Sequence, residues 1–434
     1  MQLAFPPAAA LLSAALVLSG CQAGASGGGK EPPGDPGGVE PGRRVGPPGR
    51  GAAPAPTGSG LTLYVSKAGD DRNDCSRAAP CASIQRAADR ATVAGSVVLV
   101  SDGDYAGFCS VHDGVVFFAD GDHVRVTSAL DGAGCNKRGE VGINVEGNDD
   151  VVVAGFTVVG MPGSGIRAVT GRGVVIRNNR LESNGTSGRA SGILTGFAQE
   201  VQVLYNETLA NTEHGIYVSN SDSPIDRPVI RGNDSHDNGM NGIQINGDCK
   251  TESENGSDGK VEDAVVDANH VHQNGAKGLS MISAPRVYIS NNVIEDNGPA
   301  AGGIHLVNED EDACPGDSTI GAVVVNNTIV ESTMKAIRIN EDAAGAVIFN
   351  NILVSAAPQV AIDAGNPAPA VSATNIQVTS TAGLFATGYE LSATSPARDA
   401  GQASYQGKSA PTGDFAGATR PKGAGFDAGA YETF

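Results

Sequence analysis

The sequence predicts an all-β fold made of short, repeated strands, and three observations lead to this class. Glycine contributes 60 of 434 residues, aromatic residues make up only 4%, and tryptophan is absent, a composition that favours many turns and an aliphatic core. A Gly-Ile or Gly-Leu dyad returns along the chain, and an asparagine follows an aliphatic residue in most of the intervening segments. The shorter intervals, of about 23 to 27 residues, are typical of stacked supersecondary units.

The dyad marks the start of a strand in each unit. In "GIQIN" the aliphatic residues Ile243 and Ile245 alternate with Gln244 and Asn246, the period of two expected for a strand with one buried face. The dyad begins at Gly142, Gly165, Gly192, Gly215, Gly242, Gly278 and Gly303, with alanine in its place at Ala336 and Ala361.

A corner asparagine marks a second point in each unit, three residues after an aliphatic residue. It occurs at Asn179, Asn269, Asn292, Asn327 and Asn351, with looser versions at Asn206 and Asn233. Asparagine tolerates the left-handed backbone of a sharp bend, and its amide can bond the same amide one coil away. A unit of this length cannot enclose a core alone, so the units must stack. Because the spacing of leucine-rich repeats and the Trp-Asp pairs of propellers are missing, we predict a right-handed parallel β-helix of about ten coils.

The N-terminus predicts export. Its apolar stretch, Ala8 to Leu18, is too short to span a bilayer. The following "LSGC" resembles the bacterial lipoprotein box, which implies lipidation of Cys21 and a membrane anchor at the cell surface or in the periplasm; ordinary secretion is the alternative. We therefore expect a signal peptide over 1–20, a Gly/Pro-rich tether over 21–60, the β-helix over 61–385 and an irregular capping segment over 386–434.

The cysteines predict disulfides. An even set of cysteines remains in an exported chain once Cys21 is set aside. Of the fifteen possible pairings, the short "CSRAAPC" loop favours Cys75–Cys81 and proximity in the sequence favours Cys109–Cys135, which would leave Cys249 with Cys314.

The repeats of the predicted β-helix resemble those of the pectate-lyase-like superfamily of carbohydrate-active proteins. The segments at the two ends of the β-helix show the same resemblance. "YVSKAGDD" and the following residues are similar to the family's entry strand and capping helix, here Ala82 to Thr92 with an apolar face of Ile84, Ala87, Ala88 and Ala91. "SPARDAG", "DFAGATRP" and "FDAGAYE" resemble the segment that closes many surface β-helix proteins. The resemblance covers 61–434 and implies the fold strongly, but the reaction only weakly.

Outward residues of successive coils are expected to form a polar column that suits an extended sugar chain; a solvated sheet face is the alternative. The first column is Asn144, Arg167, Leu194, Tyr217, Gln244, Ser280, His305, Arg338 and Asp363, and the second contains Asn246 and Asn340. The residues predicted to bind substrate are His214, Tyr217, Gln244, Asn246, Ser280, Lys335, Asn340 and Asp363.

Two inserts after this strand, Gly247 to Asp263 and Asn308 to Ser318, bring acidic residues together. Carboxylates at this spacing favour calcium as a cofactor, although a solvated acidic loop explains them as well. The predicted ligands are Asp248, Glu309, Asp310, Asp312, Glu341 and Asp342.

Basic residues at the same edge predict the chemistry. A lyase of acidic glycans such as pectate or alginate needs a cation on the uronate carboxylate and a base that removes the adjacent proton. The resemblance implies a base on the outward face, so Arg338, His305 and Lys277 are the catalytic candidates. Glu213 and His214 form either an acid–base pair or a loop hydrogen bond.

A noncatalytic, surface carbohydrate-binding or adhesion protein is the alternative function, because no motif diagnostic of one enzyme family is present. The "GHG" pattern of polygalacturonase-like hydrolases is absent. A net charge of −19 argues against a nucleic-acid partner, and we expect a monomer that binds a polysaccharide.

Overall fold

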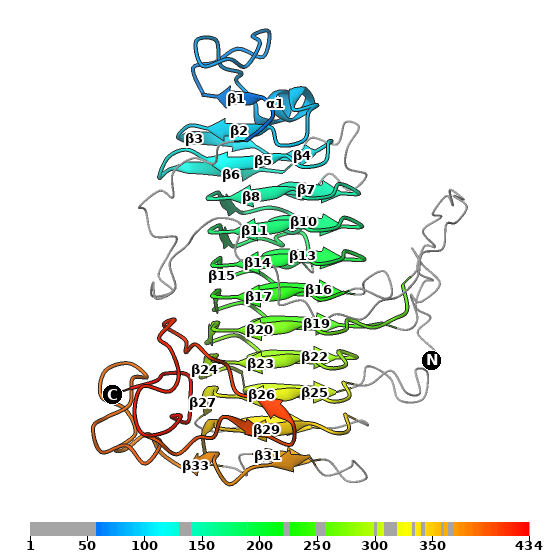
Figure 1. Ribbon diagram of the computed structural model, residues 1–434. Coiled ribbons are helices and arrows are strands. Elements are labelled where there is room, and N and C mark those ends of the chain that lie inside the picture. The colour runs from blue at the N-terminus through cyan, green and yellow to red at the C-terminus, as the bar shows by residue number, and fades with distance from the viewer. Residues whose placement is uncertain are drawn as a thin grey trace, which may run out of the picture. The chain divides into compact units, whose positions relative to one another are not determined.

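Three long parallel sheets surround one aliphatic core in the computed structural model of the protein (Figure 1). The structure describes residues 58–129, 140–188, 190–219, 226–248, 257–298, 302–307, 319–331, 335–339, 343–356, 360–362 and 369–433. All of them belong to one unit, Glu40–Phe434; the other unit, Met1–Val39, lies outside the described residues. The predicted signal peptide and nearly all of the predicted tether are therefore outside as well.

Each complete coil contributes one strand to each sheet in the order A, B, C. Sheet A contains β1 (Thr62–Val65), β2 (Val97–Val100), β5 (Val116–Ala119), β8 (Val152–Ala154), β11 (Val175–Arg177), β14 (Gln202–Leu204), β17 (Val229–Arg231), β20 (Val265–Asp267), β23 (Tyr288–Ser290), β26 (Val323–Val325), β29 (Val347–Phe349) and β32 (Ala370–Val371).

Sheet B follows sheet A along each coil. It contains β3 (Gly103–Ala106), β6 (Val124–Ser128), β9 (Thr157–Val159), β12 (Arg180–Glu182), β15 (Glu207–Leu209), β18 (Asp234–His236), β21 (His270–His272), β24 (Val293–Glu295), β27 (Thr328–Glu331), β30 (Ile352–Ser355) and β33 (Ile376–Val378).

Sheet C holds the strands that the Gly-Ile/Leu dyads predict. It contains β4 (Phe108–Ser110), β7 (Ile143–Glu146), β10 (Ile166–Val169), β13 (Ile193–Gly196), β16 (Ile216–Ser219), β19 (Ile243–Asn246), β22 (Leu279–Ile282), β25 (Ile304–Val307), β28 (Ile337–Ile339) and β31 (Val360–Ile362).

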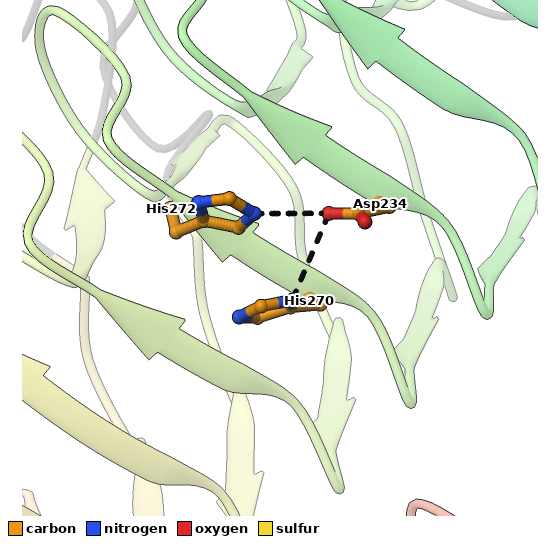
Figure 2. A group of neighbouring side chains, drawn as sticks. All are labelled: Asp234, His270 and His272. Atoms are coloured by element: carbon orange, nitrogen blue, oxygen red, sulfur yellow. Dashed lines mark hydrogen bonds and ion pairs between the residues drawn. The ribbon is translucent and has the colours of Figure 1, made fainter. Parts of the chain in front are cut away.

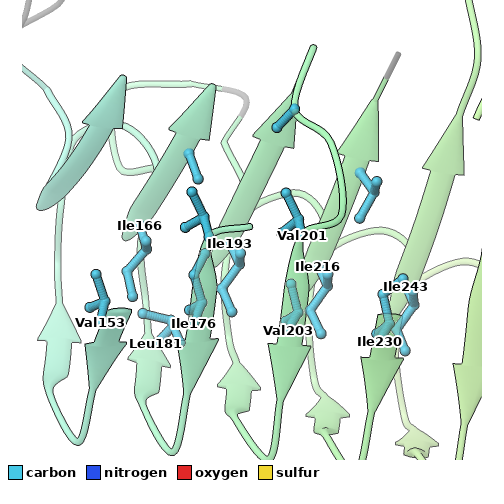
Figure 3. Packing of buried hydrophobic residues seen from close by; sticks show 14 of the residues in the cluster. Val153, Ile166, Ile176, Leu181, Ile193, Val201, Val203, Ile216, Ile230 and Ile243 are labelled. Carbon is cyan, nitrogen blue, oxygen red and sulfur yellow. The ribbon is translucent and has the colours of Figure 1, made fainter. Parts of the chain in front are cut away.

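The core consists of aliphatic residues stacked in register from coil to coil. Ile166, Ile193, Ile216 and Ile243 pair along sheet C and are fully buried (Figure 3). Each such burial contributes roughly 1.5–3 kcal/mol. Stacking is therefore what gives a single coil its stability, as the repeat pattern predicts.

The dyad glycine is required by the close approach of neighbouring coils. A Cβ atom at Gly165 would lie 2.8 Å from the carbonyl oxygen of Gly192, one coil on, and 2.9 Å from the amide nitrogen of Asn184. Both neighbours are part of the hydrogen-bonded stack and cannot move independently. Glycine recurs here because a side chain would separate the coils.

Two asparagine ladders run along the bends on either side of sheet B. In each rung the backbone N–H and the side-chain amide donate to the next Oδ1; Asn206, for example, donates to Asn233 Oδ1 at 2.9 and 3.0 Å. The first ladder is Asn179, Asn206, Asn233, Asn269, Asn292, Asn327, Asn351 and Asn375. The second is Asn184, Asn211, Asn238, Asn274 and Asn297.

In all but the last bend of the first ladder, a left-handed residue precedes the ladder asparagine. Asn178 has a φ of 55° and Asn291 a φ of 54°, whereas Asn179 and Asn292 do not adopt positive φ. The expectation that the corner asparagine itself is left-handed was therefore wrong. The left-handed turn occurs at the residue before the asparagine, and it directs the side-chain amide of the asparagine along the stack.

The N-terminal end of the coil stack is covered as predicted. Ser83 is the N-cap residue of helix α1 (Ile84–Arg90), and its hydroxyl accepts a hydrogen bond from the Arg86 N–H. Its buried residues face the first coil (Figure 1). The predicted Cys75–Cys81 disulfide is present beside it.

The C-terminal segment binds to the outside of sheets A and B and includes the hairpin of β34 (Ser404–Tyr405) and β35 (Lys408–Ser409). Left-handed asparagines hold it: Asn291 donates to the Gly413 carbonyl, Asn326 to Asp427 and Asn350 to Gln402. Figure 1 shows this segment, in orange to red, beside β24, β26 and β27. It thus covers sheets other than C.

Within the described residues, no helix has the length and hydrophobicity needed to cross a membrane.

Candidate functional site

The first outward column of sheet C forms as predicted over most of its length. Parallel pairing aligns Tyr217, Gln244, Ser280, His305 and Arg338 on successive strands. Residues up to 121 positions apart in the sequence, from Tyr217 to Arg338, therefore belong to one row of neighbours.

The last rung of this column differs from the prediction. Arg338 pairs with Ala361 rather than Asp363, because β31 aligns Val360 with Ile337. In this register Val360 packs against the core. Asp363 itself lies outside the described residues, so its predicted contact with substrate stays a prediction.

A chain of amide hydrogen bonds orders the middle of the column. Asn241 Nδ2 donates to Gln244 Oε1 at 2.5 Å, and Gln244 Nε2 donates to Asn246 Oδ1 at 3.0 Å. Asn241 Oδ1 accepts from the Lys277 backbone N–H at 2.9 Å. The predictions missed Asn241, although it directly precedes the dyad glycine. These bonds fix the orientation of both predicted amides.

His214 and Tyr217 form a flat aromatic pair at the edge of the amide chain. Their ring centroids are 5.4 Å apart and the rings are inclined by 15°. His214 Nδ1 accepts a 3.3 Å hydrogen bond from the Asn241 N–H. Burial, with a smaller effect of the Lys277 charge, lowers the pKa of His214 to about 4, so the ring is uncharged near neutral pH. Its Nε2 lies 4.0 Å from Glu213 Oε1, too far for a hydrogen bond.

Four basic side chains follow on neighbouring coils. Lys277 lies two residues before β22, His305 is in β25 and Arg338 is in β28, with Lys335 just before it. Lys277, Lys335 and Arg338 are partly exposed, while His305 is 6% exposed. Ser280 is fully buried, so its hydroxyl is not displayed on the outer face as expected.

At the other end of the first column, Arg167 forms an ion pair with Glu146. Arg167 donates to Glu146 Oε2 at 2.8 Å and to Asn144 Oδ1 at 3.0 Å. The guanidinium is thereby neutralised, and the basic character of the column is confined to the coils from Lys277 onward in the part of sheet C that is described.

Several predicted residues lie outside the described residues. Of the proposed calcium ligands, Asp248 is described and follows β19. Cys109 is disulfide-bonded, while its predicted partner is not described. The predicted residues outside are Cys21, Cys135, Cys249, Glu309, Asp310, Asp312, Cys314, Asn340, Glu341, Asp342 and Asp363.

Sheet B carries a histidine and carboxylate cluster that the predictions missed (Figure 2). Side-chain atoms of Asp234, His270 and His272 lie within 4.8 Å of one another, a group able to hold a metal ion. His236 stacks on His272, and hydrogen bonding, first to Glu207, raises the pKa of His236 to about 9. The signal in the sequence is the pair "DSHDNG" and "HVHQNG", which align when their asparagines are placed in one ladder.

Comparison with known proteins identifies the family by sequence and the fold by structure. The right handed beta helix region model matches residues 123–257 and 191–381, which together span more than half of the chain. No curated protein matches the chain by sequence.

Several solved structures are similar to this chain over most of its length. A crystal structure of pectate lyase Pel9A is 16% identical and covers 86% of this chain and 96% of that chain, with a TM-score of 0.58. A periplasmic alginate epimerase, AlgG, is 13% identical over 65% of this chain and 68% of its own, with a TM-score of 0.49. A rhamnogalacturonan lyase is 13% identical over 74% and 87%, also with a TM-score of 0.49. At these identities the likeness extends to the fold alone, and it is the family match that assigns membership: the chain belongs to the right-handed β-helix family.

Proposed function

We propose that the protein acts on an acidic polysaccharide bound along sheet C and cleaves it by calcium-assisted β-elimination. The observation that carries this proposal is the alignment of His305 with Arg338, next to Lys277, in a chain whose net charge is −19. Basic residues gathered on one face of an acidic protein attract an anionic ligand locally.

The row of outward side chains suits a linear polymer. Neighbouring strands lie about 4.8 Å apart, so a chain that crosses them meets the residue of this row on each coil in turn, except on β22, where Ser280 is buried. The stacked His214 and Tyr217 rings offer a flat apolar surface to a sugar ring, and the ordered amides of Gln244 and Asn246 offer hydrogen bonds to hydroxyl groups.

Each basic residue has a separate role in the proposed reaction. The guanidinium of Arg338 is permanently charged and its planar donors match a carboxylate, so it holds the uronate carboxylate. An imidazole is partly uncharged near neutral pH, so His305 removes the proton from the carbon next to that carboxylate. The electron pair forms the carbon–carbon double bond as the glycosidic oxygen leaves, and the role of Lys277 is to stabilise the departing oxygen.

Asp248, which follows β19, has carboxylate oxygens, the donor type that calcium takes. Calcium held by Asp248 together with the other predicted ligands would supply positive charge to a uronate carboxylate and would so make the neighbouring proton more acidic. The other expected donors lie outside the described residues, so the steps above depend on the basic side chains alone.

A noncatalytic carbohydrate-binding role is the second candidate. Gln244, Asn246 and His305 are each less than a tenth exposed, and the amides already bond one another. A rigid face of this kind suits recognition without turnover.

The test is incubation of the full-length protein with pectate, alginate and chondroitin, with calcium or with a chelator, while the ultraviolet absorbance of the unsaturated product is followed. We expect absorbance to rise with one uronate and to be lost in Arg338→Ala and His305→Ala. Arg227→Ala is the matched control, because Arg227 lies beside sheet A and pairs with Glu200. Retention on an immobilised uronate without any absorbance would establish the binding role, and absence of both would reject a polysaccharide ligand.

A further inference from the structure

The cluster on sheet B lies on a different face of the coils from the proposed substrate column. Parallel pairing places Asp234 of β18 beside His270 of β21, and His236 beside His272. Figure 2 shows the two imidazole rings and the carboxylate converging from neighbouring strands.

Two separations between the donor atoms are close to those of a zinc ligand set, and all three lie within 4.8 Å. Asp234 Oδ1 is 3.2 Å from His272 Nε2 and 3.7 Å from His270 Nδ1. Ligand atoms about 2.0–2.2 Å from a tetrahedral zinc ion lie about 3.3–3.5 Å from one another. Small side-chain adjustments are therefore enough to close the three atoms around one ion.

The other nitrogen of each ring is already engaged by an acceptor. His270 Nε2 is 2.8 Å from Glu295 Oε1, and His272 Nδ1 is 3.3 Å from Gln273 Oε1. When these nitrogens donate to their acceptors, the remaining nitrogen of each ring presents a lone pair toward the Asp234 carboxylate. Metal-binding histidines characteristically have their second nitrogen held in this way. A cation between the three atoms then accepts their lone pairs.

The carboxylate that holds His270 is itself anchored from a distant part of the chain. The Tyr389 hydroxyl, in the C-terminal segment, donates a hydrogen bond to Glu295 Oε2. The chain of contacts from Tyr389 through Glu295 to His270 thus fixes the ring orientation, as a preformed metal site requires.

The cluster is open to solvent without being fully exposed. The exposed fractions of the side chains are 26% for His270, 18% for His272 and 14% for Asp234. An ion can therefore enter from solvent and complete its coordination with water.

We propose that Asp234, His270 and His272 bind a zinc-class divalent transition-metal ion on sheet B. Two imidazole nitrogens and one carboxylate oxygen suit zinc, whereas calcium prefers oxygen donors alone. The site does not depend on the proposed lyase activity, since it shares no residue with the sheet C column.

His236 provides a matched control on the same face. Its ring stacks on His272 with centroids 4.7 Å apart, but its nitrogens face other carboxylates, Asp237 Oδ2 at 2.7 Å and Glu207 Oε1 at 3.6 Å. It therefore has a similar environment without belonging to the ligand set.

The experiment titrates zinc into the metal-depleted, full-length protein in competition with a chromogenic chelator. We expect one ion per chain at this site and a loss of affinity of about 100-fold or more in His272→Gln and Asp234→Asn, with wild-type affinity in His236→Gln. Glu295→Gln, which alters the group behind His270, should weaken binding by about 10-fold. Calcium in excess should not displace the zinc.

Cobalt supplies a second measurement that does not depend on affinity alone. The wild type and His236→Gln should show the visible bands of four-coordinate cobalt, and His272→Gln should lose them while its far-ultraviolet circular dichroism stays native. The proposal is overturned if the wild type binds no zinc, since the cluster is then a hydrogen-bonding network without a metal. It is equally overturned if His272→Gln and Asp234→Asn bind zinc as the wild type does, since the ion then lies elsewhere.

Discussion

Asn297 donates two hydrogen bonds to the carboxyl group of Glu331, one from its backbone N–H and one from its side-chain amide, both at 3.2 Å. Glu331 thus takes the place that an asparagine holds on earlier rungs of the second ladder. The side chain is almost fully buried, and burial raises the pKa of Glu331 from its usual 4.5 to about 7. The second ladder therefore ends at a carboxyl group whose uncharged form is favoured in the folded protein.

Replacing Glu331 with glutamine should remove a pH dependence of stability. A raised pKa in the folded state means that the contribution of the protonated carboxyl is complete below about pH 4.5 and is lost as the pH rises through about 7. The rise in the pKa of Glu331 from 4.5 to about 7 corresponds to a change of about 3 kcal/mol in the free energy of unfolding across this pH range. Urea unfolding should therefore show Glu331→Gln gaining up to about 3 kcal/mol over the wild type as the pH rises through this window.

The control for this prediction is Glu140→Gln, which changes an exposed carboxylate. The free energy of unfolding of Glu140→Gln should equal that of the wild type at every pH. Parallel curves for Glu331→Gln and the wild type would show that Glu331 ionises normally.

His214 should produce the opposite dependence. Its pKa is lowered from 6.5 to about 4, chiefly by burial, so the stability that comes from the uncharged ring is present above about pH 6.5 and is lost as the pH falls through about 4. His214→Gln should lack this acid-induced loss in urea unfolding. In addition, Lys277→Met should raise the His214 pKa measured by NMR, because it removes the nearby positive charge; an unchanged value would contradict the proximity of the two groups.

A rung in the middle of an asparagine ladder should be costly to remove. Asn269 Oδ1 accepts two hydrogen bonds from Asn233, and Asn269 Nδ2 donates to the Ile230 carbonyl. Asn269→Ala leaves these buried groups unsatisfied, so we expect a loss of about 3 kcal/mol or more in the free energy of unfolding. Gln202→Ala, an outward amide on β14, should change it by less than about 0.5 kcal/mol. Equal effects of the two substitutions would contradict a structural role for the ladder.

The C-terminal segment depends on a buried ion pair. Arg420 and Glu432 are fully buried and lie 2.7 Å apart, and Arg420 also donates to Asn291 Oδ1 in the bend after sheet A. Arg420→Met should cost about 3–5 kcal/mol, because it leaves the Glu432 charge buried and unpaired. The double variant Arg420→Met, Glu432→Leu should recover part of this loss in thermal unfolding. If it is no more stable than the single variant, the unpaired charge is not the cause.

Much of the fold follows from short stretches of sequence. The alternation of Ile243 and Ile245 with polar neighbours places strand β19, the apolar face of Ile84, Ala87 and Ala88 places the capping helix, and the spacing of Cys75 and Cys81 places a disulfide. These features depend on residues that are close together in the chain, which is why the sequence alone determined them.

The packing of the coils decided which residues lie side by side. Successive ladder rungs are 27 residues apart from Asn206 to Asn233 but 36 apart from Asn233 to Asn269, because inserts of different length leave the coils. Sequence spacing therefore could not align Asp234 with His270, or Arg338 with Ala361. Hydrogen bonds between coils and burial of aliphatic residues such as Val360 set that alignment, and both exist only once the coils are packed.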